Sequence, residues 1–473
     1  MNRKEHFVNP YLPPWEYVPD GEPHVFAGRV YVYGSHDRFG GWVYCQNDYV
    51  CYSAPVDDLR DWRYEGVIYQ KTQDPYNGDG HMCLYAPDVT RGPDGRYYLY
   101  YVLDKVSVVS VAVCDTPAGQ YTFLGYVRHG DGTLYGQGGG DEPQYDPAVL
   151  TEGERTYLYT GFCFPHDRSR HGAMATVLGS DMLTIVEEPV FVMPSAPYSA
   201  GSGSEGHEFF EGPSIRKLGD TYYFVYCSVN MHELCYAVSN RPTAGFNYQG
   251  VLISGCDLGI SDGKPSDKPM SYAGNIHGGL LSLGDRHYIF YHRHTNATSF
   301  SRQACFEQLT RLPGGGFRQA ELSSCCGCGP LPGRGEYPAW LACHLIPGET
   351  PQALRGLSAA WEEGHTPKLT QDGRDGDEEP VFLANLNDGA IAGFKYFDFQ
   401  GVKTVSVYTR GYGKGAYHVS TAWDGPSLGA ISVDYTNVWT RFSASVAIPD
   451  GVHALYFTYR GMGNSSLQRF ILE

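Results

Sequence analysis

Residues 95–102 read GRYYLYYV, a turn glycine followed by a strand dense in tyrosine, and similar stretches recur along the first two thirds of the chain. The other copies are GRVYVYGS at 28–35, RTYLYTG at 155–161, GDTYYFVYC at 219–227 and GDRHYIFYHR at 284–293. Spacings of 67, 59, 66 and 65 residues separate the equivalent tyrosines, which are Tyr31, Tyr98, Tyr157, Tyr223 and Tyr288. A period of this length indicates a repeat architecture.

Each repeat predicts a small antiparallel sheet. Apolar and tyrosine residues alternate after turns such as Pro93-Asp94-Gly95, which is typical of a β-hairpin, and each unit is long enough for about four strands. One four-stranded sheet cannot bury both of its faces, so five separate small domains are excluded. The repeats therefore predict an all-β chain that begins with a five-bladed β-propeller.

The repeat stops near residue 325, and the rest of the chain predicts a second domain. Short alternating strands such as KTVSVYTRG and HALYFTYRG indicate a β-sandwich of the jelly-roll type. We predict a propeller at 1–325, a connecting segment at 326–345 and a sandwich at 346–473. The stretch GEYPAWLACHL at 335–345 is too apolar for a flexible linker, so we expect the two domains to pack together.

Composition excludes several classes of protein. The 473 residues carry 35 Lys and Arg against 52 Asp and Glu, a net charge of −17, which disfavours nucleic acid and anionic membranes as partners. The first thirty residues contain no long apolar run, and the 13 cysteines are odd in number and scattered, so we expect reduced thiols and a cytoplasmic protein. The cluster at Cys325, Cys326 and Cys328 lacks the further ligands that a zinc site needs.

A polar residue precedes each repeat tyrosine by ten to twelve positions, near the start of the predicted innermost strand. The five residues are Asp20, Asp88, Asp146, Glu211 and His277. Innermost strands line the axis of a propeller, so these chain-distant groups are expected to converge there. Several carboxylates in an aromatic pocket, without a Ser/His pair or a phosphate loop, point to acid/base hydrolysis of a glycosidic bond.

Four motifs carry a resemblance to glycoside hydrolase family 43. They are NPYL at 9–12 followed by Asp20, YAPDV at 85–89, YDPAVL at 145–150 and FFEGPSI at 209–215. The resemblance covers roughly residues 7–320. It implies a five-bladed propeller and a hydrolysis that inverts the configuration at the anomeric carbon. It also implies that α-L-arabinofuranosides and β-D-xylosides are the substrates, that the chemistry needs no cofactor, and that a structural calcium is possible.

The resemblance also implies roles for individual residues. Asp20 matches the general base, Asp88 the aspartate that modulates the pKa of the acid, and Glu211 the general acid. Because Gly21 stands where the family usually has proline, Glu22 remains an alternative base. Asp146 matches an aspartate without a catalytic role.

Four further residues are assigned to metal or substrate binding around the predicted catalytic residues. His277 resembles an axial histidine that borders a calcium or a water cluster, so we assign it to a metal. Arg302, His36 and Tyr85 are expected to bind substrate. Arg302 has an equally weighted alternative as half of a surface salt bridge.

The last 130 or so residues resemble a family 6 carbohydrate-binding module, for which a sugar-binding role and a purely structural role are equally supported. Together these features predict an exo-acting enzyme on plant cell-wall oligosaccharides, first an α-L-arabinofuranosidase. The alternatives are a β-D-xylosidase, a bifunctional enzyme, a phosphorylase and, more distantly, a non-catalytic sugar-binding propeller. A phosphorylase would need a phosphate pocket beside Asp20, where the sequence offers only His24, Arg29, His36 and Arg38. The sequence does not indicate an oligomeric state.

Overall fold

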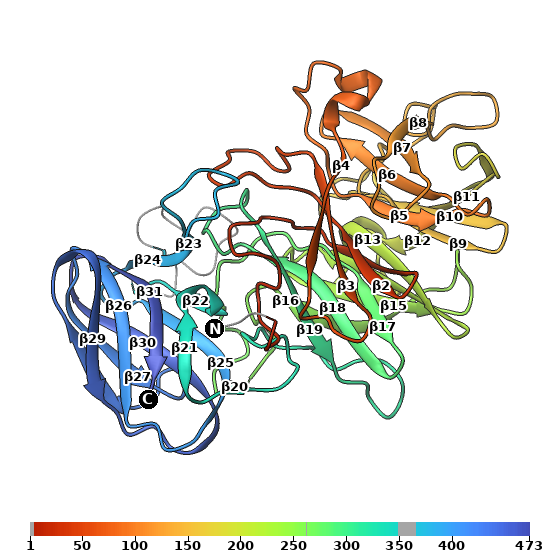
Figure 1. Ribbon diagram of the computed structural model, residues 1–473. Coiled ribbons are helices and arrows are strands. Elements are labelled where there is room, and N and C mark those ends of the chain that lie inside the picture. Colours follow the sequence, from red (N-terminus) through yellow and green to blue (C-terminus); the bar gives the residue numbers. More distant parts are fainter. Residues whose placement is uncertain (1–3, 262, 349–365) are drawn as a thin grey trace.

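The computed structural model describes residues 4–261, 263–348 and 366–473, and it consists of two all-β units packed against each other (Figure 1). The described part of the chain contains only short 3-10 helices, at Lys71–Gln73, Pro75–Asn77, Ala196–Tyr198 and Ala339–Leu341. None of them is long and apolar enough to cross a membrane. The all-β class predicted from the repeats is confirmed.

Five antiparallel sheets make up the first unit. The first is β1 (Glu22–Phe26), β2 (Arg29–Tyr33), β3 (Tyr49–Pro55) and β4 (Arg63–Tyr69). The second is β5 (Asp88–Arg91), β6 (Tyr97–Leu103), β7 (Val106–Cys114) and β8 (Thr122–Tyr126). The third is β9 (Ala148–Glu152), β10 (Arg155–Thr160), β11 (Gly172–Leu178) and β12 (Ile185–Pro194). The fourth is β13 (Phe209–Leu218), β14 (Thr221–Ser228), β15 (Glu233–Ser239) and β16 (Asn247–Ser254), and the fifth is β17 (Leu280–Leu283), β18 (Arg286–Arg293) and β19 (Gln303–Leu309).

The first strands of the five sheets form a closed ring. β1 contacts β5, β5 contacts β9, β9 contacts β13, β13 contacts β17, and β17 contacts β1. The sheets are therefore the five blades of the predicted propeller, with their first strands innermost. The fifth blade differs from the prediction in having three described strands. The N-terminal segment runs beside β19, where the Tyr11 N–H donates to the Ala304 carbonyl (3.2 Å), and so links the first blade to the last.

Tyrosine-rich strands suit this fold because each blade is buried on both faces. On β6, Leu99 and Tyr101 pack with side chains of the first blade, while Tyr98 and Tyr100 pack with the third. The alternation follows from the two-residue period of a strand. The buried hydroxyls find acceptors, since Tyr101 donates to Asp74 (2.6 Å) and Tyr100 to a main-chain carbonyl (2.8 Å).

Two six-stranded sheets form the second unit. One contains β20 (Leu331–Pro332), β22 (His344–Ile346), β25 (Ile391–Phe399), β27 (Lys414–Ser420), β28 (Gly429–Val433) and β30 (Gly451–Met462). The other contains β21 (Gly335–Pro338), β23 (Lys368–Thr370), β24 (Phe382–Leu386), β26 (Thr404–Gly411), β29 (Thr436–Ser445) and β31 (Ser465–Leu472). Because β20, β21 and β22 belong to these sheets, the sandwich begins near residue 331, inside the predicted connecting segment.

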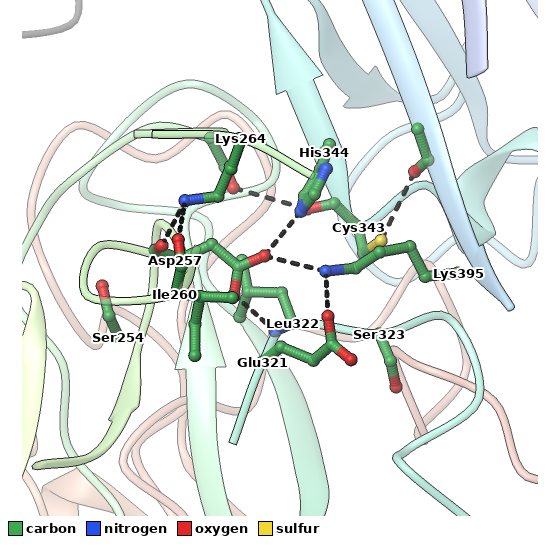
Figure 2. Close-up of polar contacts among 12 residues, drawn as sticks. Ser254, Asp257, Ile260, Lys264, Glu321, Leu322, Ser323, Cys343, His344 and Lys395 are labelled. Atoms are coloured by element: carbon green, nitrogen blue, oxygen red, sulfur yellow. Dashed lines mark hydrogen bonds and ion pairs between the residues drawn. The ribbon is translucent and has the colours of Figure 1, made fainter. Parts of the chain in front are cut away.

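A buried ionic cluster joins the two units (Figure 2). The Asp257 carboxylate, from the end of the fourth blade, accepts hydrogen bonds from the His344 Nε2 (2.6 Å) and the Lys395 Nζ (3.0 Å) of the sandwich. Lys395 also binds Glu321 (2.8 Å). Close by, the Lys264 ammonium donates to the main-chain carbonyls of Asp257 and Ile260, both at 2.7 Å. These contacts, with shared apolar packing, hold the sandwich directly on the propeller.

We expect Lys395→Met to lower the free energy of unfolding by about 3–5 kcal/mol, because it leaves the buried Asp257 carboxylate without its cation. Lys414→Met is the matched control, since the Lys414–Asp434 pair is exposed and is worth about 0–1 kcal/mol. Urea unfolding of the two variants measures the difference. Equal losses in both would contradict a structural role for the buried pair.

Candidate active site

The propeller contains a cavity of about 180 Å³. Several of its polar lining residues lie close to the starts of the innermost strands β1, β9, β13 and β17. Its lining residues are Asp20, Tyr44, Cys45, Tyr85, Ala86, Asp146, Phe162, Glu211, Asn275, His277 and Arg302. Three carboxylates thus meet from the first, third and fourth blades. Asp20 and Asp146 each stand two residues before their strand, and Glu211 is the third residue of β13.

Asp20 is held as an anion by Arg302. The guanidinium donates from Nη1 to the Asp20 Oδ1 (3.0 Å) and from Nε and Nη2 to Asp37 (2.8 and 3.0 Å). Burial alone would raise the pKa of the Asp20 carboxyl, but Arg302 holds it well below its usual range. Arg302 is buried and lines the cavity, so the alternative of a surface salt bridge is wrong. Its role in binding substrate stays a prediction.

Glu211 has the opposite environment. Burial raises the pKa of Glu211 above its usual range, and the Asp146 carboxylate raises it further. Asp146 is its direct neighbour, because the Asp146 Oδ2 accepts the N–H of Gly212 (3.3 Å). The Asn275 amide lies 3.4 Å from the Glu211 Oε1. The cavity therefore holds an ionised carboxylate at Asp20 and a carboxyl group at Glu211 that retains its proton to higher pH.

The predicted role of Asp88 is wrong, because Asp88 does not line the cavity. Its carboxylate accepts hydrogen bonds from the N–H groups of Val89 (2.7 Å) and Val149 (2.8 Å) and contacts the His24 Nε2 (2.5 Å). Asp88 is the first residue of β5, whereas Asp146 lies two residues before the start of β9. Asp88 therefore stands two positions further along its blade than Asp146 does. Two residues of strand span about 6.6 Å, which accounts for its different neighbours. Asp146, expected to be structural, takes the place beside Glu211.

Glu22 and His36 also lie outside the cavity. The Glu22 carboxylate binds the Ser214 hydroxyl (2.9 Å) and the Arg216 guanidinium (2.5 Å), so Asp20 is favoured over Glu22 as the base. His36 contacts the main-chain carbonyl of Asp48 through Nδ1 (2.9 Å), and the expectation that it binds substrate is wrong. Its ring is engaged in the fold of its own loop. Tyr85 lines the cavity as expected.

His277 lines the cavity, and its assignment to a metal stays a prediction. Burial alone would lower the pKa of His277, but the carboxylates of Glu22 and Asp146 raise it to about 9, so the ring is a cation at neutral pH. Calcium takes six to eight oxygen ligands, whereas no group of three candidate ligands in the described residues includes His277. A nearby group, Glu22 with His24 and Asp88, has the Arg216 guanidinium beside it already.

Sequence reasoning missed five lining residues, Tyr44, Cys45, Ala86, Phe162 and Asn275, and also Asp37, which binds Arg302. Asn275 stands two positions before His277 and could have been found from that motif. The two aromatic residues lie in loops, and Asp37 acts through Arg302 and through the N–H of Cys45, from which its carboxylate accepts a hydrogen bond (2.9 Å). No pattern in the sequence marks the two aromatic residues or Asp37.

The sandwich unit contacts the loop that supplies part of the cavity wall. The Asp375 carboxylate accepts hydrogen bonds from the N–H of Phe39 (2.6 Å) and the amide of Asn47 (3.0 Å). These residues flank the loop that supplies Tyr44 and Cys45 to the cavity wall. Beside it, the Leu369 main chain pairs with residues 295 and 296 of the fifth blade. The cavity wall is therefore stabilised from both units.

We expect Asp375→Ala to lower kcat/KM roughly tenfold, chiefly through KM, because the wall loop loses two hydrogen bonds to a charged group, each worth about 1.5–3 kcal/mol. Steady-state kinetics measures the change. Asp372→Ala is the control, since Asp372 lies on the same segment but pairs with Arg410 of the sandwich. The same loss in both variants would contradict a specific role for Asp375.

Comparisons with known proteins agree with this geometry. The family model of glycosyl hydrolases family 43 matches residues 24–315. A "Xylosidase/arabinosidase" of Thermoclostridium stercorarium is 65% identical over 471 residues, 99% of both chains. A "Xylosidase/arabinosidase" of Bacteroides ovatus is 30% identical over 280 residues, 52% of this chain and 80% of the relative.

One solved structure shares the two-unit architecture. The arabinoxylan arabinofuranohydrolase of Bacillus subtilis, solved with cellotetraose, aligns with a TM-score of 0.52 and 18% identity over 98% of this chain and 97% of its own. At this identity the likeness supports the fold alone. The chain belongs to glycoside hydrolase family 43, as shown by the family model, by the relative that is 65% identical over 99% of its length and by the converging carboxylates.

Proposed function

We propose that this glycoside hydrolase releases single pentose units, as α-L-arabinofuranose or β-D-xylose, from the ends of plant cell-wall oligosaccharides. The observation that carries the mechanism is the contrast between Asp20, kept ionised by Arg302, and Glu211, kept protonated by burial and Asp146. Carboxyl groups whose environments separate their pKa values in this way mark the base and the acid of a hydrolase. Members of family 43 need no cofactor for catalysis.

In the proposed reaction Glu211 gives its proton to the glycosidic oxygen as the bond to the anomeric carbon breaks. The Asp20 carboxylate takes a proton from the water that bonds to that carbon from the opposite face. Asp146 keeps the pKa of Glu211 high, and Arg302 holds Asp20 in place. Exchange with solvent then returns a proton to Glu211 and removes one from Asp20.

The size and lining of the cavity support release of one sugar at a time. A volume of about 180 Å³ is below the roughly 300–1,000 Å³ of pockets for drug-sized ligands. Tyr44, Tyr85 and Phe162 offer rings for stacking on a sugar, and Asn275 offers an amide for a hydroxyl. The name "Xylosidase/arabinosidase" of the relative that is 65% identical supports both pentoses.

Initial rates on para-nitrophenyl α-L-arabinofuranoside and β-D-xyloside test the substrate class. We expect turnover of both, and no turnover of the matched glucoside and galactoside. Activity confined to a hexoside, or absent from all four, would refute the proposal.

We expect inversion of the anomeric centre. Asp20 and Glu211 come from the first and fourth blades, an arrangement suited to the separation of about 6.5–9.5 Å that admits a water between base and sugar. Retaining enzymes hold their carboxyls about 5–5.5 Å apart. Proton NMR of the first-formed pentose measures the outcome, and release of the same anomer as the substrate would overturn both assignments.

A further inference from the structure

Three side chains of different chemistry meet on the fourth blade, outside the catalytic cavity. His207 lies two residues before β13, and Glu233 and Cys235 are the first and third residues of β15. Alternation along a strand places the side chains of Glu233 and Cys235 on one face. One donor atom from each of the three lies within 4.8 Å of the other two. None of the three residues lines the cavity or takes part in the proposed reaction.

Two of the three separations between the donor atoms are close to those in a tetrahedral metal site. The Cys235 Sγ lies 3.5 Å from the Glu233 Oε1 and 3.9 Å from the His207 Nδ1. Zinc bonds of about 2.0–2.3 Å imply donor separations of roughly 3.3–3.6 Å. The third edge, from the His207 Nδ1 to the Glu233 Oε1, is a hydrogen bond of 2.6 Å. It needs to open by less than 1 Å once a cation replaces the shared proton.

The three side chains are already held in position. The His207 ring stacks on Tyr248, with centroids 5.2 Å apart and planes 15° apart. Ser228 and Asn230 donate to the Glu233 Oε1 at 2.6 and 2.9 Å. Such outer hydrogen bonds orient metal ligands and are typical of built sites. Glu233 and Cys235 are buried, while the His207 side chain is 36% exposed, which leaves an approach from solvent.

The donors also select the kind of cation. A thiol, an imidazole and a carboxylate suit zinc and similar borderline divalent ions rather than calcium or magnesium, which prefer oxygen. Within the described part of the chain, no arginine or lysine makes a hydrogen bond or ion pair with these three residues, unlike the group at Glu22, which Arg216 neutralises.

We propose that His207, Glu233 and Cys235 form a binding site for a borderline divalent cation such as Zn²⁺, with water as the fourth ligand. On binding, the Cys235 thiol releases its proton to solvent and a metal–sulfur bond forms, without any change of oxidation state. The bound ion would tie the chain before β13 to β15. Glu211 lies on β13, four residues after His207, so the site stabilises the strand that carries the proposed acid.

Titration with Co²⁺ tests this site directly, because a cobalt–thiolate bond gives an intense near-ultraviolet band that histidine and carboxylate ligands do not. The full chain is stripped with chelator and kept reduced with a phosphine. We expect the band to saturate at one equivalent, Zn²⁺ to displace Co²⁺ and remove the band, and Zn²⁺ to raise the thermal midpoint. A chain that shows no band overturns the proposal.

Matched variants locate the metal. Cys235→Ser is expected to abolish the band, and Cys51→Ser, at a cysteine equally buried in a strand of the first blade, to keep it. A band that survives Cys235→Ser would place the metal elsewhere, for example at Cys328, and refute the site. If Cys235→Ser does not fold, His207→Gln at the more exposed ligand decides. Zn²⁺ affinity should then fall by more than about tenfold, and an unchanged affinity refutes the site.

Discussion

Glu211→Gln is expected to lower kcat on a xylo- or arabino-oligosaccharide by about 10²–10⁴-fold, because the leaving oxygen loses its proton donor. The loss should be much smaller on an aryl glycoside, whose leaving group needs little protonation. Steady-state kinetics on the two substrate types measures the difference. Glutamine has nearly the same shape as glutamate, so the cavity should keep its form.

Glu208→Gln is the matched control for this prediction. Glu208 is buried three residues earlier in the chain, but it bonds to Ser199 and does not line the cavity. Its kinetics should stay close to those of the parent enzyme on both substrates. Equal losses on natural and aryl substrates in Glu211→Gln would show that Glu211 binds substrate rather than donating a proton.

Asp146→Asn is expected to move the alkaline limb of the activity profile to lower pH. Glu211 must be protonated to act, and its raised pKa keeps it so as the pH rises. Burial is the larger cause of that raised pKa and the Asp146 charge is the second, so removing the charge lowers the pKa of Glu211. The acid is then lost at a lower pH than in the parent enzyme. The pH dependence of kcat measures the shift.

Asp88→Asn separates this effect from the loss of any buried carboxylate. Asp88 is fully buried, and its bonds lead to His24 and to the main chain of the third blade rather than to Glu211. We expect lower stability with an unshifted alkaline limb. A shifted limb in Asp88→Asn and an unshifted one in Asp146→Asn would restore the assignment made from the sequence.

Repetition explains why the fold could be predicted. The five tyrosine-rich strands recur at a nearly constant spacing, and a four-stranded sheet with two apolar faces must be covered on both sides. The strand β6 shows the consequence, since its alternate side chains enter the cores on either side of the second blade. The sandwich boundary could not be found in this way. β20 to β22 are two to four residues long, too short to show a period, and join sheets whose other strands come later.

The sequence by itself determined the propeller, the sandwich, and the carboxylates Asp20 and Glu211 as candidates, because all of these follow from local pattern and motif. Only the tertiary structure decided that Asp146, rather than Asp88, lies beside Glu211, and that Arg302 holds Asp20 as an anion. It also brought Asp375 to the loop that supplies part of the cavity wall, from more than three hundred residues away along the chain. The reason is physical: the pKa of a carboxyl depends on burial and on charges within a few ångströms. Those distances are set by packing between blades, and a shift of two residues along a strand changes every neighbour.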